Sequence, residues 1–170
     1  MSATTPNTEK LYSTRNCLHA PVRAQLVEAL NRRLADAIDL QCQCKQAHWN
    51  VKGPNFIALH KLFDEVHAGV EGYVDLLAER VVQLGGVALG TIESVAEFSE
   101  LDEYPTGIAK GDDHVKAMSI ALAAFGSRIW STIQTATELN DADSADICTE
   151  ISRGTDKWLW FVEAQIQTKP

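Results

Sequence analysis

The chain has 170 residues, of which 45% are hydrophobic and 22% are charged, and its formal net charge is −8. The length is that of one domain with a substantial core. The negative charge excludes a nucleic-acid binder that works through overall charge, and it favours cationic partners such as metal ions. No apolar run of about 18 residues is present, which excludes a membrane span.

The N-terminal segment, residues 1–16, is rich in Ser, Thr and Asn, so we expect a flexible arm ahead of a single domain over residues 17–168. It lacks the apolar stretch of a signal peptide. The cysteines show no disulfide or metal-site spacing, and we expect free thiols in a reducing cytoplasm. They are Cys17, Cys42, Cys44 and Cys148.

Apolar residues recur at three- and four-residue steps in four long segments, which predicts four long helices. These cover residues 21–51, 56–84, 112–139 and 143–166, and a short helix over 91–98 lies in the long connection 87–107. We expect Asn55 to cap the second helix and Asp143 or Ser144 to cap the last. No segment alternates as a strand would. The order predicts an all-α, ferritin-like four-helix bundle, with the short helix in the crossover between the second and third long helices.

The second helix carries an unusual stripe of titratable side chains at helical spacing. The stripe contains His60, Asp64, His67, Glu71 and Asp75, with Glu79 at its edge. Burying such groups unpaired costs free energy, and imidazole and carboxylate together suit divalent iron, zinc or manganese. The Gly53-Pro54 turn folds the first helix back on the second and could bring His48 beside His60. We therefore predict a metal site here.

One copy of this helix is too long to complete such a site. Asp64 and Asp75 are eleven positions apart (75 − 64), or about 16 Å along the axis, whereas ligands lie about 2.0–2.3 Å from a metal. An antiparallel copy across a two-fold axis would place Asp64 against the partner's Asp75, and His60 against the partner's Glu79. We predict that the metal sites lie between subunits.

Simpler interpretations stand beside this one. A single histidine on a helix surface is more often solvated than a metal ligand, and the same stripe could form a salt-bridged dimer without metal. His67 would meet the partner's Glu71 as an ion pair more readily than it would add a ligand. The Glu-x-x-His motif of intra-bundle di-iron sites is absent, and Asp64-x-x-His67 is the nearest match, which argues against an ordinary ferritin or a di-iron oxygenase.

Four motifs resemble those of the Dps family, the mini-ferritins named as DNA-binding proteins from starved cells. They are H-W-N-V-x-G-x-x-F-x-x-L-H-x-x-F-D at 48–64, D-x-x-A-E-R at 75–80, Gln83-Leu84-Gly85-Gly86, and Asp156-Lys157-Trp158-Leu159-Trp160. The resemblance covers nearly the whole chain.

The resemblance implies a hollow homododecamer with 23 symmetry and dinuclear ferroxidase sites at its two-fold interfaces. Iron(II) would be oxidised there, typically by hydrogen peroxide, although the sequence does not choose between peroxide and oxygen. Ferric mineral would collect inside and DNA would be protected. The implied iron ligands, which could also hold zinc, are His48, His60 and Asp64 of one subunit and Asp75 and Glu79 of its mate. Lys45 and Trp49 would be near neighbours, and Trp49 would either accept an oxidising equivalent or simply pack.

The resemblance also places Asp141, Asp143 and Asp146 near a three-fold axis, as an acidic pore for iron uptake. Helix capping is the alternative role for these residues, and we favour Asp146 as the pore residue. Direct DNA binding is not expected without cation bridging or low pH, because the tails offer only Lys10 and Lys169. A nucleoid-compacting protein with little catalytic role and a structural or adhesive oligomer are the competing functions.

Overall fold

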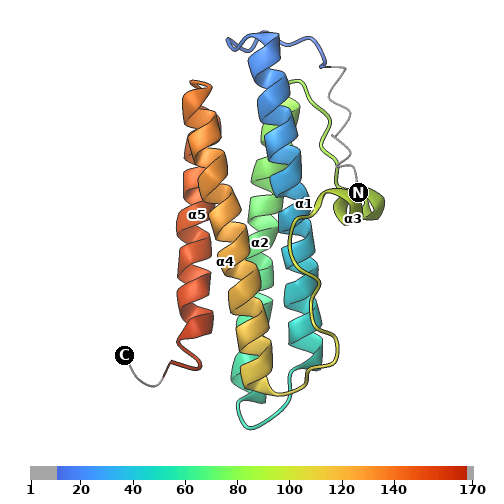
Figure 1. Ribbon diagram of the computed structural model, residues 1–170, viewed down its shortest axis with the longest axis vertical. Coiled ribbons are helices and arrows are strands. Elements are labelled where there is room, and N and C mark those ends of the chain that lie inside the picture. The colour runs from blue at the N-terminus through green and yellow to red at the C-terminus, as the bar shows by residue number, and fades with distance from the viewer. Residues whose placement is uncertain (1–10, 168–170) are drawn as a thin grey trace.

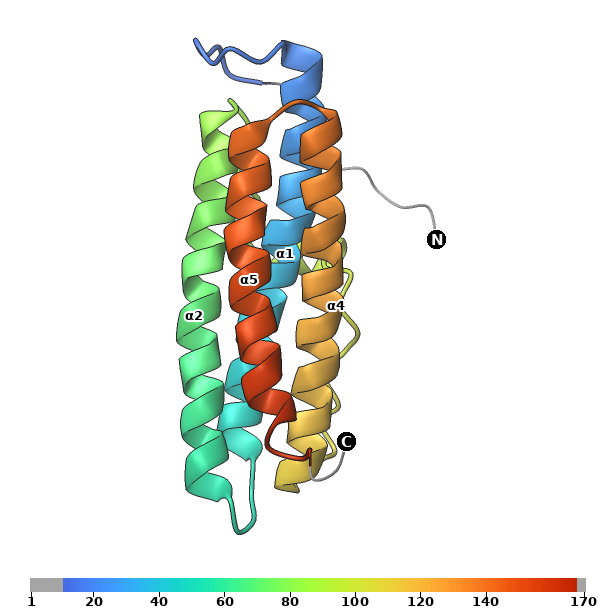
Figure 2. The ribbon, with the colours of Figure 1, turned by 90° about the vertical axis from the view of Figure 1, so that its left-hand side faces the viewer.

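The computed structural model describes residues 11–167, which form four long helices and one short helix. They are α1 (Ala20–Asn50), α2 (Phe56–Gln83), α3 (Ile92–Phe98), α4 (Gly111–Glu138) and α5 (Ala142–Glu163). The hairpins α1–α2 and α4–α5 pack side by side as one antiparallel bundle, and α3 lies outside it against α1 (Figures 1 and 2). The only β-type pairing in the described range is an isolated bridge between Lys52 and Lys110. The predicted all-α, ferritin-like bundle is confirmed.

The helix bounds agree with prediction to within one residue, except that α5 ends at Glu163 rather than near residue 166 and begins with a different cap. Neither Asp143 nor Ser144 is its cap: the helix begins at Ala142, and Asp141 is the N-cap residue. The turn from α4 is shorter than predicted because Asn140 adopts a left-handed backbone with φ 58°, a conformation that asparagine tolerates better than most residues. Both residues that were expected to cap the helix therefore lie inside it.

The core fills the space between the four long helices. Its largest fully buried side chains include Leu26, Leu30, Leu34, Leu40, Phe63, Leu77, Met118, Leu122, Phe125, Ile129 and Ile151. The helices α2 and α5 approach closely at two glycines. The Trp158 indole lies over Gly69, where a Cβ would be 2.5 Å from Nε1, and the Tyr73 hydroxyl occupies the space beside Gly154. These glycines are needed because any larger side chain would push the two helices apart.

The crossover between α2 and α4 is held along α1 by polar side chains. The Asn31 amide donates to the Val87 carbonyl at 3.1 Å and its oxygen accepts from the Leu89 amide at 3.0 Å. Farther along, Arg33 pairs with both Asp36 and Glu100. These contacts hold the long connection in one path on the outside of the bundle. Within the described residues, no helix is long and apolar enough to cross a membrane.

The segment 11–16, which we expected to belong to a flexible arm, is held against the far end of α2. The Tyr12 amide donates to the Gly85 carbonyl at 2.8 Å, and Leu11 packs on the core. Gly85 has φ 86°, and a Cβ there would be 2.6 Å from the Tyr12 carbonyl oxygen. The rest of the predicted arm, residues 1–10, lies outside the described residues.

All four cysteines are free thiols, as predicted. Cys17 and Cys42 are exposed, whereas Cys44 and Cys148 are buried. Burial raises the pKa of Cys148 to about 12, which keeps this thiol protonated and unreactive. The buried cysteines therefore serve as small apolar core residues.

Candidate metal centre

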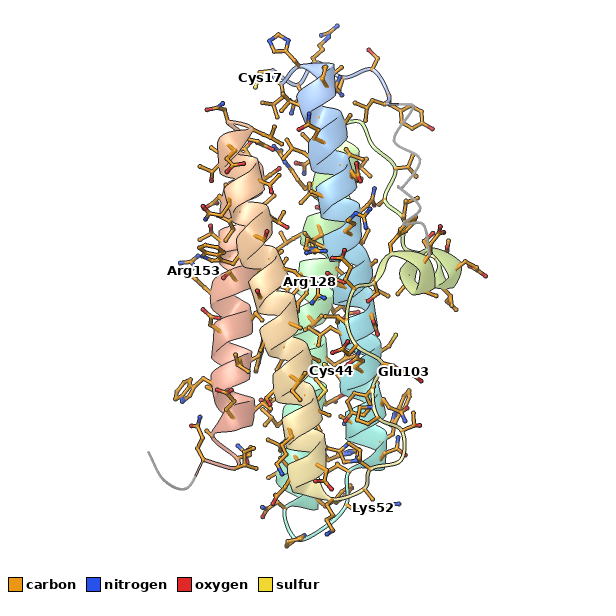
Figure 3. All side chains as sticks on the ribbon, viewed as in Figure 1. Cys17, Cys44, Lys52, Glu103, Arg128 and Arg153 are labelled. Carbon is orange, nitrogen blue, oxygen red and sulfur yellow. The ribbon has the colours of Figure 1, made fainter. Side chains whose placement is uncertain are left out.

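Two histidines meet where α1 ends and α2 begins, at the end of the bundle marked by Lys52 in Figure 3. The rings of His48 and His60 are stacked, with centroids 3.7 Å apart and planes inclined by 21°. The chain reverses between them in a short turn that requires Gly53 at φ 117°, a backbone conformation that other residues rarely adopt. The turn brings the two rings together, as the sequence predicted for this pair.

Each ring is fixed by the backbone of the opposite helix. His48 Nδ1 lies 2.7 Å from the His60 carbonyl oxygen, and His60 Nδ1 lies 2.9 Å from the His48 carbonyl oxygen. A carbonyl oxygen only accepts, so both Nδ1 atoms carry the hydrogen. In the neutral rings this leaves a lone pair on each Nε2. The pair is thereby held in the tautomer in which Nε2 can bind a metal.

A carboxylate lies beside the two rings. Asp64 follows His60 by one helical turn on α2, is half exposed, and accepts a 2.6 Å hydrogen bond from Lys45 Nζ. That hydrogen bond lowers the pKa of Asp64, so the group is a carboxylate at neutral pH. Lys45 Nζ also lies 5.9 Å from the centre of the Trp49 ring, which is 67% exposed. Lys45 therefore lies beside both Asp64 and Trp49.

The remaining predicted ligands are on the outer surface of α2. Asp75 and Glu79 are exposed, and His67, which was expected to form an ion pair rather than to bind metal, is half buried. Across residues 11–167, no group of three or more histidine, cysteine or acidic side chains is arranged to hold a metal ion. One chain therefore brings His48, His60 and Asp64 into one neighbourhood, but its described residues do not by themselves form a metal site.

The three aspartates at the start of α5 differ in their surroundings. Asp141 is 4% exposed, and its carboxylate accepts hydrogen bonds from Arg80 at 2.7 and 3.0 Å and from the Ser144 hydroxyl. Burial acts to raise the pKa of Asp141, but the hydrogen bonds from Ser144 and Arg80 outweigh it and the pKa is lowered. Asp141 therefore joins α5 to α2, and its carboxylate is not free to line a pore.

The other two aspartates face solvent. Asp143 is exposed and lies 3.6 Å from Arg80. Asp146 is exposed beside an open hollow of about 540 Å³ that it lines with Thr137, Asn140 and Thr149. Of the three, Asp146 is the carboxylate best placed to meet a cation from outside.

Sequence reasoning assigned no role to Arg80. Its side chain is 5% exposed and binds Asp141, Ser144 and Gln83. The signal was present, because an arginine on the buried side of a helix requires a partner. That partner lies 61 residues later in the chain, beyond the reach of a local pattern.

The ferritin family, described as a ferritin-like domain, matches residues 27–169. The chain is 42% identical over 160 residues to the DNA protection during starvation protein of Agrobacterium fabrum, covering 94% of this chain and 99% of that protein. The chain belongs to the Dps family. The membership predicted from the four motifs is thus confirmed.

Solved Dps structures resemble this member of the family over most of its length. The tetragonal form of Mycobacterium smegmatis Dps aligns with a TM-score of 0.88 at 27% identity, covering 92% of this chain and 96% of that one. Dps from Microbacterium arborescens in the high iron form aligns with a TM-score of 0.81 at 35% identity, covering 91% and 99%. The Dps fold is therefore shared over nearly the whole chain.

Proposed function

We propose that this Dps-family protein is a ferroxidase that oxidises iron(II) at sites shared between two subunits. It stores the ferric product inside a homododecamer of 23 symmetry and so protects DNA from oxidative damage. The observation that carries the proposal is the pair His48 and His60, locked by carbonyls with both Nε2 atoms available, next to the Asp64 carboxylate. A related Dps structure was determined in a high iron form, which agrees with iron as the substrate.

The exposed face of α2 supports a partner subunit as the source of the missing ligands. Asp75 and Glu79 lie on this face with Asp64, all exposed. In the antiparallel pairing the axis passes between Ala68 and Gly72, and a Cβ added at Gly72 would meet nothing within 4 Å. Small residues at the crossing point let two helices approach closely. The partner's Asp75 and the partner's Glu79 would then complete the site around His48, His60 and Asp64.

This ligand set suits oxidation of the bound substrate. Carboxylates stabilise iron(III) more than iron(II), and two imidazoles with shared carboxylates leave positions open for an oxidant. Two iron(II) ions can deliver both electrons that hydrogen peroxide needs, so no hydroxyl radical is released. Hydrogen peroxide is the oxidant that we favour over oxygen.

The route for iron and the location of the protein complete the proposal. Asp146, at the open hollow near the start of α5, is the residue that we assign to iron uptake at a three-fold axis. Asp143 would add negative charge beside it. The four free thiols fit a reducing bacterial cytoplasm.

The test is stopped-flow iron(II) oxidation after peroxide is added to the assembled, anaerobic protein. His60→Ala and Asp64→Ala should slow the appearance of ferric absorbance by about 100-fold or more, with assembly unchanged in light scattering. His19→Ala and Asp112→Ala, at exposed positions outside the site, are the matched controls. Unchanged rates in the site variants would contradict the proposal. A DNA gel shift at moderate salt without iron oxidation would support the nucleoid-compacting alternative.

A further inference from the structure

An open hollow lies between α1, α3 and the crossover that follows α3, and none of the proposed iron ligands lines it. Its volume is about 440 Å³, which is within the range of pockets that bind small molecules. In Figures 1 and 3, α3 and the labelled Glu103 lie on the same outer side of α1. The apolar part of the lining comes from Ile38, Gly90, Ile92, Val95, Ala96 and Leu101.

Hydrogen bonds between α1 and the crossover hold the walls of the hollow in place. The Ser99 hydroxyl, just after α3, donates to the Asp39 carboxylate at 2.6 Å. The side-chain nitrogen of Gln43, a residue that is 5% exposed, donates to Asp39 and to the Asp102 carbonyl oxygen, each at 3.1 Å. The hollow is therefore formed before any ligand enters it, which lowers the entropic cost of binding.

The charged side chains that line the hollow are all negative. They are Asp39 and Glu103, and no lysine, arginine or histidine is among the lining residues. Neither carboxylate forms an ion pair within the described part of the chain, since Arg33 and Arg128 pair with Glu100 instead. The donors to Asp39 are neutral, so they leave its charge in place. Charge complementarity at this apolar surface therefore favours a cation.

We propose that the hollow binds a small organic cation, in which an ammonium group is attached to an apolar body. The apolar body lies against side chains such as Ile38 and Leu101, and the ammonium group faces Asp39 and Glu103. An ammonium group donates hydrogen bonds and accepts none. It matches the two carboxylates and the side-chain oxygen of Gln43, which has no assigned partner among the described residues. This binding site is independent of the proposed iron oxidation.

The charge preference can be tested on the assembled full chain by saturation-transfer NMR. The probes are naphthylmethylammonium, naphthylmethanol and naphthoate, which share one apolar body and differ in charge. We expect the cation to bind about 10-fold more tightly than the anion, with the neutral alcohol between them. Added salt should reduce the difference, because it screens the two carboxylates.

Two pairs of variants locate the bound cation. Cys42 is exposed and lines the hollow, so Cys42→Trp should fill it and abolish binding, whereas Cys17→Trp, at the other exposed cysteine, should keep it. Glu103→Gln should weaken binding of the cation by about 3- to 10-fold. Glu97→Gln removes the same charge from an exposed position on α3 outside the lining, and should change the affinity by less than about 2-fold.

Each contrary outcome overturns the inference. Equal affinities for the three probes would exclude a cation site, and cation binding that survives Cys42→Trp would place the cation elsewhere. A wild type that binds none of the probes would show that the hollow is covered, for example by a second copy of the chain. If Cys42→Trp does not assemble, the exposed position of Glu103 still allows a test, and an unchanged affinity in Glu103→Gln would overturn the inference.

Discussion

Polar side chains are buried and fully paired at one end of α2, whereas at the other end they are exposed and only partly paired. At its C-terminal end, Arg80 and Asp141 are both about 95% buried, and their groups are paired with each other and with Ser144. At its N-terminal end, Asp64 is half exposed and the Nε2 atoms of two histidines have no assigned partner among the described residues. A saturated, buried network holds helices together, whereas an unsaturated one at the surface is available to a ligand.

The largest expected effect on stability is at the C-terminal end of α2, where Arg80 and Asp141 are buried and paired (the saturated end). Arg80→Ala leaves the Asp141 carboxylate buried and unpaired, and should lower the free energy of unfolding by about 3–5 kcal/mol. Asp143→Asn, at an exposed position, should change it by less than about 0.5 kcal/mol. Urea unfolding at one fixed protein concentration measures both. Equal losses in free energy of unfolding for the two variants would contradict the structural role assigned to the Arg80–Asp141 pair.

At the N-terminal end of α2, beside His48 (the open end), substitutions should change metal affinity rather than the free energy of unfolding. His60→Gln removes one imidazole ligand and should weaken binding of zinc(II), used as a redox-inert probe, by about 10- to 100-fold. His67→Gln on the same helix should change it little, because His67 is assigned no ligand role. Calorimetric titration of the assembled protein measures both affinities. A larger loss of zinc(II) affinity for His67→Gln than for His60→Gln would show that the metal site lies nearer to His67.

Low pH should reduce the stabilisation that Asp141 provides at the saturated end. Its pKa is lowered in the folded state from an ordinary value of 3.8. The stabilisation is therefore complete above pH 3.8, and it is lost as the pH falls through the lower folded-state pKa. Comparing urea midpoints of wild type and Asp141→Asn from pH 6 to pH 2 should show a difference that shrinks at the acid end. A constant difference would show that the carboxylate charge is unimportant.

The smallest effect is expected from Lys45→Met at the open end. Loss of the 2.6 Å hydrogen bond should return the pKa of Asp64 toward its ordinary value. Carboxyl titration by NMR reads the shift directly. Stability should hardly change, because the pair is exposed to solvent and such pairs contribute little. A marked loss of stability would show that this end, too, is structural.

The contrast also explains what could be predicted from sequence. The helices were predictable because their apolar period is local, and so was the meeting of His48 and His60, because a short turn joins their helices. The role of Asp141 was not, since an aspartate before a helix reads equally as a cap or as part of an acidic pore, and its partner Arg80 is 61 residues away. The cap of α5 was misplaced because the left-handed Asn140 shortens the turn. Ligands from a second subunit are outside the reach of one chain, so Asp75 and Glu79 stay predictions.

The crossed hydrogen bonds of His48 and His60 have a consequence for the working cycle. Because each ring is oriented by the main chain of the other helix, the proposed iron site would keep its shape when empty. Little rotamer entropy would be lost on metal binding, since folding already immobilises both rings. In the proposed ferroxidase, iron ions would therefore enter and leave without any rearrangement of the two histidine rings.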